Sequence, residues 1–240
     1  MENKIKKLTE LVEGSGNIVF FGGAGVSTES GIPDFRSVDG LYRQKFAYPP
    51  ETILSHSFYV SHKTEFFEFY RAKMLTSGAM PNAAHLKLAE LEKSGKLRAV
   101  ITQNIDGLHQ KAGSKQVLEL HGSVLRNYCE RCGKFYGVEK IAESKGVPKC
   151  DCGGDVKPNV VLYEEGLNED VISKAVNFIR QADMLIIGGT SLTVYPAAGL
   201  VRYYRGRKLV VINKGGIGTA LGADLVIDGP IGQVLGGIHV

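Results

Sequence analysis

Long apolar runs are missing from this chain of 240 residues. No stretch approaches the roughly 18 consecutive apolar residues that a membrane-spanning helix needs. The first ten residues are polar and rich in lysine, and no apolar signal segment follows them. We therefore expect a cytoplasmic protein without membrane contact.

A strong excess of one charge is missing as well. The chain has 29 Lys and Arg against 25 Asp and Glu, which gives a net charge of +4 spread along its length. Direct binding of nucleic acid is therefore not expected, because it usually needs a concentrated basic face. Hydrophobic residues make up 43% of the chain, enough for one sizeable core and a small appended module.

Cysteine is scarce and confined to one segment. A C-x2-C pair is followed, 17 residues later, by a C-x-C pair, and the four residues are Cys129, Cys132, Cys150 and Cys152. Four thiolates complete the tetrahedral shell of one zinc ion and leave no position for water, so the site would be structural. The alternatives are buried or redox-active cysteines, or a ribbon that binds nucleic acid. Acidic residues around the cysteines argue against the ribbon, because no basic face is evident.

Short apolar segments alternate with segments of helical periodicity. The expected strands are 18–21, 99–101, 117–120, 184–187, 209–212 and 225–227. The expected helices are 5–12, 65–75, 83–91 behind Asn82 as N-cap, 107–112 and 168–181, with another beginning at Pro196. Strands that are apolar throughout indicate a parallel sheet covered by helices on both faces, the doubly wound α/β arrangement.

The region of the cysteines has a different composition. Between Cys129 and Asp155 the apolar runs disappear, and Gly, Lys and Cys predominate. We expect a poorly cored zinc-binding insert over residues 124–159, within a Rossmann-like domain of residues 1–123 and 160–240. Residues 40–80 would be the helical part of the small domain.

A glycine-rich loop follows the first expected strand. Residues 22–27 read Gly-Gly-Ala-Gly-Val-Ser, which allows backbone N–H groups to approach a pyrophosphate, and a helix starting there would add its dipole. Thr28 stands where the G-x-G-x-x-G fingerprint has its third glycine, so a plain turn is the alternative. An aromatic ring and a cation soon afterwards, Phe35 and Arg36, favour a nucleotide.

Polar groups also follow other expected strands. Residues 102–106, Thr-Gln-Asn-Ile-Asp, offer two amides and a carboxylate for binding, or an N-cap for the next helix through Asp106. His121 follows a strand and precedes a glycine, which makes it the best candidate for a general base. The other five histidines are interpreted as structural. No G-x-S-x-G motif indicates a hydrolase triad.

Taken in order, these motifs resemble the sirtuin family over nearly the whole chain. They are the segments 23–27, 30–36, 102–106, 120–122, the four cysteines, 189–192 and 211–213. The resemblance implies an NAD-dependent protein lysine deacetylase with a Rossmann-like domain, a small zinc-binding domain and acyl-lysine bound between them. Such enzymes consume NAD as a co-substrate, remove an acyl group from lysine, and release nicotinamide, free lysine and 2′-O-acyl-ADP-ribose. For this chain an acetyl or other uncharged acyl group is expected.

The resemblance also implies a role for individual residues. The catalytic residues would be His121, as the base, and Asn104. The contacts to NAD would be Gly23, Ala24, Thr28, Phe35, Arg36, Gln103, Asn104, Ile105, Asp106, Thr190, Ser191, Asn213 and Asp224. One structural zinc ion would bind the four cysteines.

The partner implied is a protein or peptide that carries acetyl-lysine. It would add as a strand along an extended edge at residues 160–163, with Val161 and Leu162 lining the acyl-lysine tunnel. Many relatives read Phe-Gly-Glu where this chain has Tyr163-Glu164-Glu165. Sirtuins that remove succinyl groups carry Tyr-x-x-Arg, whereas residues 70–73 end in lysine, so poor desuccinylation is expected. The oligomeric state stays open, and a monomer is compatible with the sequence.

Three other functions are compatible with part of these motifs. ADP-ribosyl transfer to a protein would use the same site, and a non-catalytic module that binds NAD and zinc would not need His121. An oxidoreductase is disfavoured by the missing third glycine and by the absence of an acidic residue at the end of a second strand.

Overall fold

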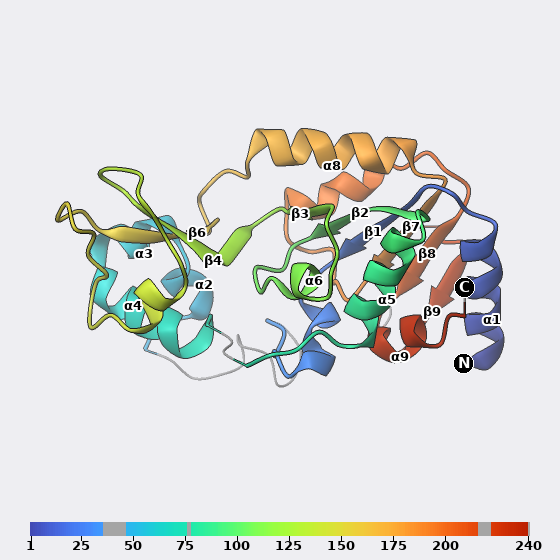
Figure 1. Cartoon of the computed structure of the whole chain (residues 1–240), viewed down its shortest axis with the longest axis horizontal. Helices are drawn as coiled ribbons and strands as arrows, with labels where there is room; N and C mark the ends of the chain where they lie inside the picture. The colour runs from blue at the N-terminus through green and yellow to red at the C-terminus, as the bar shows by residue number, and fades with distance from the viewer. Residues whose placement is uncertain (36–46, 76–77, 216–221, 240) are drawn as a thin grey trace.

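The computed structural model describes residues 1–35, 47–75, 78–215 and 222–239. Its strands form a six-stranded and a three-stranded sheet, which lie in two regions of the molecule (Figure 1). We call the six-stranded sheet and the helices on its faces the large region. The three-stranded sheet over residues 122–160 and the helices over residues 50–73 are the small region.

The large sheet is parallel throughout and has the strand order β3-β2-β1-β7-β8-β9. Its strands are β1 (Ile18–Gly22), β2 (Leu97–Thr102), β3 (Val117–Glu119), β7 (Met184–Gly188), β8 (Leu209–Ile212) and β9 (Leu225–Ile227). The chain runs outward from β1 to β3 and then returns to the other side of β1 with β7. This order confirms the doubly wound prediction, and the point between β1 and β7 is where such sheets bind their ligands.

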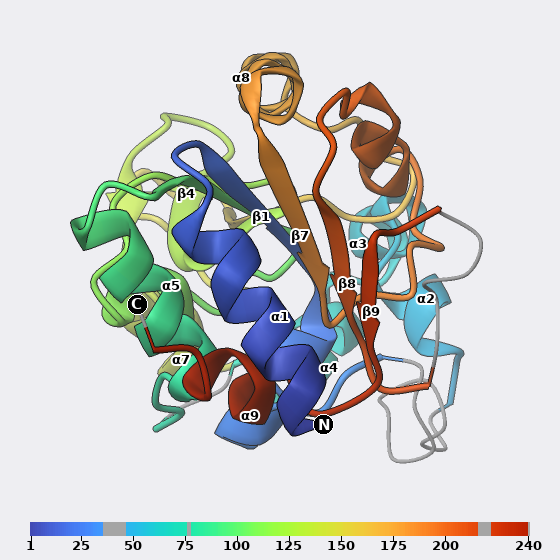
Figure 2. The same ribbon diagram turned by 90° about the vertical axis from the view of Figure 1, so that its right-hand side faces the viewer.

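Helices cover both faces of the large sheet (Figure 2). These are α1 (Glu2–Glu13), α5 (Ala83–Lys93), α6 (Leu108–Lys111), α8 (Glu169–Gln181), the 3₁₀ helix η4 (Ala197–Tyr203) and α9 (Ile231–Gly236). Ile18 and Phe20 pack with α1, α5 and α9 on one face, while Val19 and Phe21 pack with α8 and η4 on the other. Because the central strands β1 and β7 are buried on both faces, their sequences are apolar throughout.

The small region joins segments that are distant in the sequence. It contains α2 (Pro50–Ile53), α3 (His56–Ser61), α4 (Lys63–Lys73), β4 (Gly122–Cys129), β5 (Phe135–Tyr136), α7 (Glu139–Ala142) and β6 (Val156–Val160). The three strands are antiparallel in the order β5-β4-β6. A cluster of fully buried rings, Tyr59, Phe66, Phe67 and Tyr70, comes from α3 and α4.

The zinc-binding insert does not pack as a separate unit. Ile141 and Val156 have no exposed surface and pack with Cys129 and Cys150 in the same core as the rings of α3 and α4. The insert has no apolar run of its own because helices from another part of the chain supply most of this core. The strands β4 and β6 also extend across the boundaries expected after residues 123 and 159.

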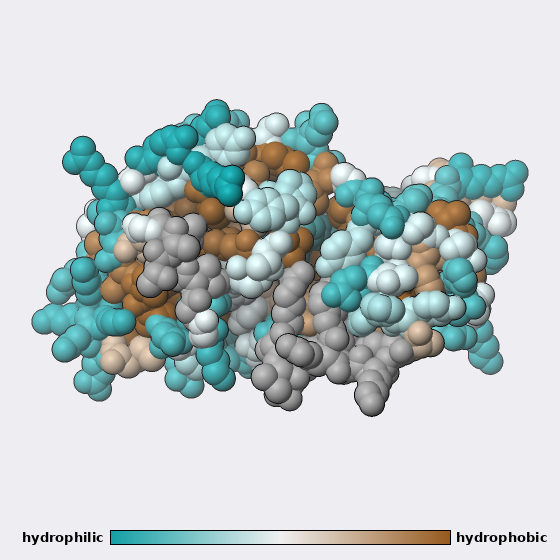
Figure 3. Space-filling model, turned by 180° about the vertical axis from the view of Figure 1, so that it is seen from behind, coloured by the Kyte–Doolittle hydropathy of each residue, from teal (hydrophilic) through white to brown (hydrophobic). Residues whose placement is uncertain are grey.

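The surface seen from behind has a notch in its outline between the two regions (Figure 3). None of the helices in the described ranges is long and apolar enough to cross a membrane.

Candidate functional site

The glycine loop lies across the ends of β1 and β7. The Gly23 N–H donates to the Gly188 carbonyl at 3.3 Å, and the Gly25 N–H donates to the Gly189 carbonyl at 2.8 Å. A Cβ atom added to Gly25 would lie 2.9 Å from the Gly189 Cα, and Gly189 itself has φ of +58°. Glycine is therefore required here for two backbone segments to pass each other closely.

The loop does not lead into an α-helix, contrary to the prediction. It forms two short 3₁₀ helices, η1 (Ala24–Val26) and η2 (Thr28–Ser30), and the Thr28 hydroxyl donates to the Gly25 carbonyl at 3.0 Å. The dipole of a long helix is thus not available, and the N–H groups of Gly23, Gly25, Val26 and Ser27 already donate to carbonyl oxygens within the protein. The Asn82 side chain holds the loop from behind by donating to the Val26 carbonyl at 2.8 Å, while its Oδ1 caps α5 as predicted.

A buried polar network connects the loop to the end of β2. The Ser27 hydroxyl donates to the Asp106 carboxylate at 2.7 Å and accepts from the Asn104 amide at 3.0 Å. The other Asp106 oxygen accepts the Leu108 N–H at 2.9 Å, the bond of an Asx turn just before α6, whose N-cap is Gly107. This turn and the placement of Asp106 at the site are therefore compatible. Ser27 was not singled out in the sequence, because its partners lie almost 80 residues away.

His121 faces the same edge of the sheet from the start of β4. Its Nδ1 lies 2.9 Å from the Gln103 carbonyl oxygen. A carbonyl can only accept, so Nδ1 carries the hydrogen, and Nε2 of the neutral ring holds a free lone pair. Burial lowers the pKa of His121 below its usual value, although the Gln103 carbonyl opposes the shift. The neutral ring is thus favoured near pH 7, as a general base requires.

The end of β7 joins this group through Thr190. Its hydroxyl oxygen accepts from the Gln103 amide at 3.0 Å and from the Leu192 N–H at 3.1 Å. Ser191, which follows it, is exposed and lies 2.7 Å from the Thr193 hydroxyl. Three strand ends, of β1, β2 and β7, are therefore connected through predicted site residues together with Ser27, which was not predicted.

Two further predicted residues follow β8 or precede β9. Asn213 lies at the carboxyl end of β8, where its N–H donates to the Ile227 carbonyl. Asp224 lies at the opposite, amino end of β9 and accepts the N–H of Leu209, the first residue of β8, so its placement at the site is wrong. Asp228 was overlooked, yet it follows β9 at the site edge and accepts the Gly215 N–H at 3.1 Å.

The remaining predicted residues lie beside the small region. Ile105 and Phe35 are partly buried and pack against the core of that region. Arg36 falls outside the described residues.

The four cysteine sulfurs converge as predicted. All four lie within 4.8 Å of one another, with 3.5 Å between Cys129 and Cys152 and 3.6 Å between Cys132 and Cys150. Zinc–sulfur bonds of about 2.3 Å place tetrahedral sulfurs about 3.8 Å apart, so the cluster fits one zinc ion. A hydrogen bond from the Tyr136 hydroxyl lowers the pKa of Cys150 to about 6, which favours the thiolate.

The segment after β6 connects the two regions. The Val161 N–H donates to the His121 carbonyl at 3.0 Å, and the Tyr163 N–H donates to the Leu54 carbonyl at 2.9 Å. The Leu162 N–H donates to the Glu165 carboxylate at 2.9 Å. The edge is therefore less open than predicted, because most of its donors are already used within the protein.

The stretch compared with Tyr-x-x-Arg is part of the core. Tyr70 has no exposed surface, and Arg71 donates to the Gly146 carbonyl at 2.9 Å. Lys73, on which the expectation of poor desuccinylation depends, is exposed, and that expectation stays a prediction.

Comparisons with known proteins agree with this geometry. The profile of the Sir2 family matches residues 23–196. The NAD-dependent protein deacetylase of Clostridium perfringens is 61% identical over 240 residues, covering 98% of both chains. That of Cutibacterium acnes is 53% identical over 236 residues, covering 98% of this chain and 97% of the relative.

Solved structures show the same likeness. A Sir2 structure with a p53 peptide and NAD⁺ has a TM-score of 0.84 and 42% identity, covering 96% of this chain and 95% of that one. One with a deacetylated p53 peptide and 3′-O-acetyl-ADP-ribose has a TM-score of 0.87 and 41% identity, covering 98% and 99%. From its sequence, its fold and the arrangement of its site, this chain belongs to the Sir2 family.

Proposed function

We propose that the chain removes acetyl or other uncharged acyl groups from lysine side chains of proteins and consumes NAD in doing so. The products are nicotinamide, the free lysine and 2′-O-acyl-ADP-ribose. The observation that carries this proposal is the neutral His121 beside the glycine loop, in a Sir2 family chain that is 61% identical to an NAD-dependent protein deacetylase.

The donor set at the sheet edge fits NAD. The loop residues Gly23, Ala24 and Thr28 lie where a pyrophosphate could meet backbone N–H groups, and Thr190, Ser191 and Asn213 follow the neighbouring strands. Gln103, Asn104, Ile105 and Asp106 would hold the ribose and the nicotinamide amide. Phe35 and Arg36 complete the proposed set. NAD supplies an activated ribose carbon to which the acyl oxygen is transferred.

His121 is the proposed base in this site. The Gln103 carbonyl holds its Nδ1 hydrogen, so Nε2 can take a proton from a ribose hydroxyl. Asn104 is proposed to position the reacting groups, because its amide is already oriented by the buried Ser27 hydroxyl. A buried, largely neutral surrounding suits a reaction that builds positive charge at the ribose carbon.

The other assignments concern the rest of the molecule. Residues 1–123 and 160–240 would be the NAD-binding domain, with the zinc-binding insert and the helical part over residues 40–80 as the small domain. The substrate peptide would lie along the segment after β6, with Val161 and Leu162 near the acyl-lysine. The cytoplasm is the proposed location, since a site of four thiolates needs a reducing compartment.

Mass spectrometry of the products tests the proposal. The chain is incubated with NAD and an acetyl-lysine peptide, and both peptide mass and small products are recorded. Free lysine together with O-acetyl-ADP-ribose supports deacetylation. A gain of ADP-ribose on a protein acceptor without loss of acetyl would show ADP-ribosyl transfer instead. No release of nicotinamide would indicate a non-catalytic module.

A further inference from the structure

Glu164 has a backbone conformation that is unusual for its residue type. It follows Tyr163 in the segment after β6 and has φ of +75°, in the left-handed region that favours glycine. Holding a non-glycine residue there costs on the order of 1 kcal/mol. The cost is offset locally, because the Glu164 carboxylate accepts the Ser57 N–H at 2.9 Å and the Ser57 hydroxyl at 3.0 Å at the start of α3.

This residue is also where the segment can still pair with a peptide. The N–H groups of Val161, Leu162, Tyr163 and Glu165 all donate within the protein. Among the described residues, the Glu164 N–H has no such acceptor. The Glu164 N–H could therefore donate to the backbone of an extended peptide. It lies three residues after Val161, whose N–H donates to the His121 carbonyl.

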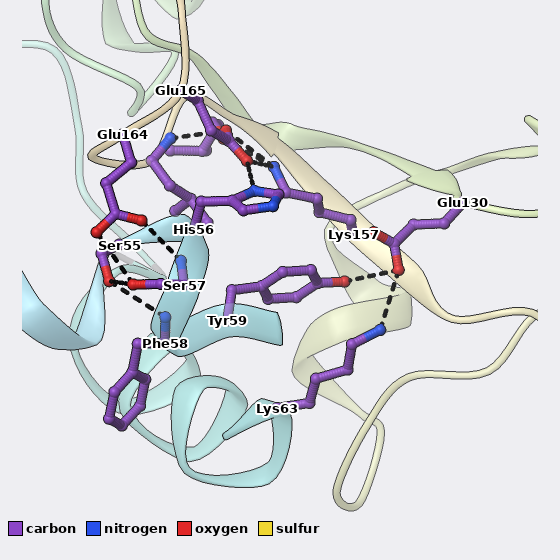
Figure 4. Close-up of polar contacts among 12 residues, drawn as sticks. Ser55, His56, Ser57, Phe58, Tyr59, Lys63, Glu130, Lys157, Glu164 and Glu165 are labelled. Carbon is purple, nitrogen blue, oxygen red and sulfur yellow. Dashed lines mark hydrogen bonds and ion pairs between the residues drawn. The ribbon is translucent and has the colours of Figure 1, made fainter. Parts of the chain in front are cut away.

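Glu164 differs from Glu165 and Glu130 in the groups that surround its carboxylate (Figure 4). Glu165 lies 3.2 Å from the Lys157 ammonium and 2.9 Å from His56, and Glu130 lies 3.2 Å from the Lys63 ammonium. Burial would raise the pKa of Glu165, but the Leu162 N–H, His56 and Lys157 together hold it below its usual value. Glu164 forms no ion pair with any described residue, and it is exposed. It is thus a negative charge that neighbours leave unbalanced.

We propose that Glu164 determines substrate specificity by favouring peptides with lysine or arginine close to the acetyl-lysine. The inference rests on the proposed function, because it needs an acetylated peptide along this segment. A cation on the peptide would approach an exposed carboxylate that has hydrogen bonds but no counter-charge. An acidic residue at the same position would be repelled.

The test compares three acetyl-lysine peptides that differ only in the residues beside the acetyl-lysine, which are arginine, alanine or glutamate. Exposed ion pairs contribute about 0.2–1 kcal/mol, so kcat/KM for the arginine peptide should exceed that for the glutamate peptide by roughly two- to fivefold at low salt. The ratio should fall as salt is added, because exposed charges are screened. In Glu164→Gln, which keeps an oxygen acceptor for Ser57, the ratio should approach one.

Two controls separate charge from structure. Glu164→Gly suits the left-handed backbone and should also abolish the preference, so a folding defect of one variant does not decide the result. Glu10→Gln removes the same charge from the exposed face of α1 in the large region and should leave the ratio unchanged.

The outcomes are distinct. Equal kcat/KM for the arginine and glutamate peptides in the unaltered chain, or a preference that persists in both Glu164 variants, overturns this inference. Absence of turnover with the alanine peptide instead argues against the proposed function itself.

Discussion

In the large region the central strands β1 and β7 bury both faces under helices, whereas the small region packs a three-stranded sheet and the helices of residues 50–73 around one core of aromatic and aliphatic side chains, beside the cysteine cluster. The large region thus has an apolar core on each face of its sheet and polar groups at the carboxyl edge. The small region has one core, which segments distant in the sequence share, and four cysteines that could hold a metal ion. It supplies the segment proposed to meet the peptide.

The largest expected effect separates chemistry from stability in the large region. His121→Ala should lower kcat for deacetylation by about 10²–10⁴-fold, because the general base is lost. Binding of NAD and the melting temperature should change little. His239→Ala, at an exposed position near the chain end, is the matched control. Turnover and binding of NAD measure the effect, and activity within a few-fold of the unaltered chain would contradict the role of His121.

Removal of the metal should destabilise the small region more than the large region. Cys150→Ser takes away a buried ligand, so the protein should lose zinc and most of its deacetylase activity, because structural zinc sites contribute directly to folding. Hydrogen exchange should accelerate in β4 and β6 while β1 and β7 stay protected. Zinc content by mass spectrometry and exchange rates measure this. Equal loss of protection in β1 would show that the two regions unfold together.

Acid should weaken the large region through two buried histidines. Burial lowers the pKa of His85 to about 4, against a small opposing effect of Asp106, and burial together with His85 lowers that of His109 to about 3. Both pKa values lie below the unfolded value of about 6.5, so the unfolded chain binds protons first as the pH falls. The free energy of unfolding is therefore highest above pH 6.5 and decreases as the pH falls toward 4 and 3. At pH 5 each histidine should lower the free energy of unfolding by about 2 kcal/mol relative to its value above pH 6.5.

The measurement is the free energy of unfolding between pH 7 and 5. Neither ring nitrogen of His109 has a hydrogen-bond partner among the described residues, so His109→Leu should flatten the pH dependence without breaking a bond. His239→Gln should leave the pH dependence as it is. A pH dependence unchanged in His109→Leu would refute this origin of the acid sensitivity.

The smallest expected effect is the loss of unfolding free energy when an ion pair is removed from either region. The Lys63 ammonium in the small region lies 2.7 Å from Asp155 and 3.2 Å from Glu130, beside the cysteines, so Lys63→Met should destabilise by about 1 kcal/mol. Lys87→Met, which removes a single i,i+3 pair with Glu90 on α5, should stay within about 0.5 kcal/mol. Urea unfolding of both variants measures the difference, and equal values would remove the distinction.

Sequence reasoning predicted the features that depend on local pattern. The apolar strands, the Asn82 cap, the cysteine cluster and the position of His121 after a strand are all present in the structure. Ser27 and Asp228 were overlooked because nothing next to them in the chain indicates their partners. Asp224 was assigned from the family resemblance alone, and the structure puts it at the amino end of β9, away from the carboxyl edge of the sheet.

The sequence alone determined the doubly wound sheet, the glycine loop and the four cysteines, because hydrophobic periodicity, backbone freedom and ligand spacing are properties of neighbouring residues. Only the tertiary structure decided that Nδ1 of His121 carries the hydrogen, because it faces the Gln103 carbonyl. The shared core of the insert with α3 and α4, and the missing counter-charge of Glu164, were likewise decided there. These features arise from contacts between segments far apart in the chain, whose pairing the folded sheet and core establish.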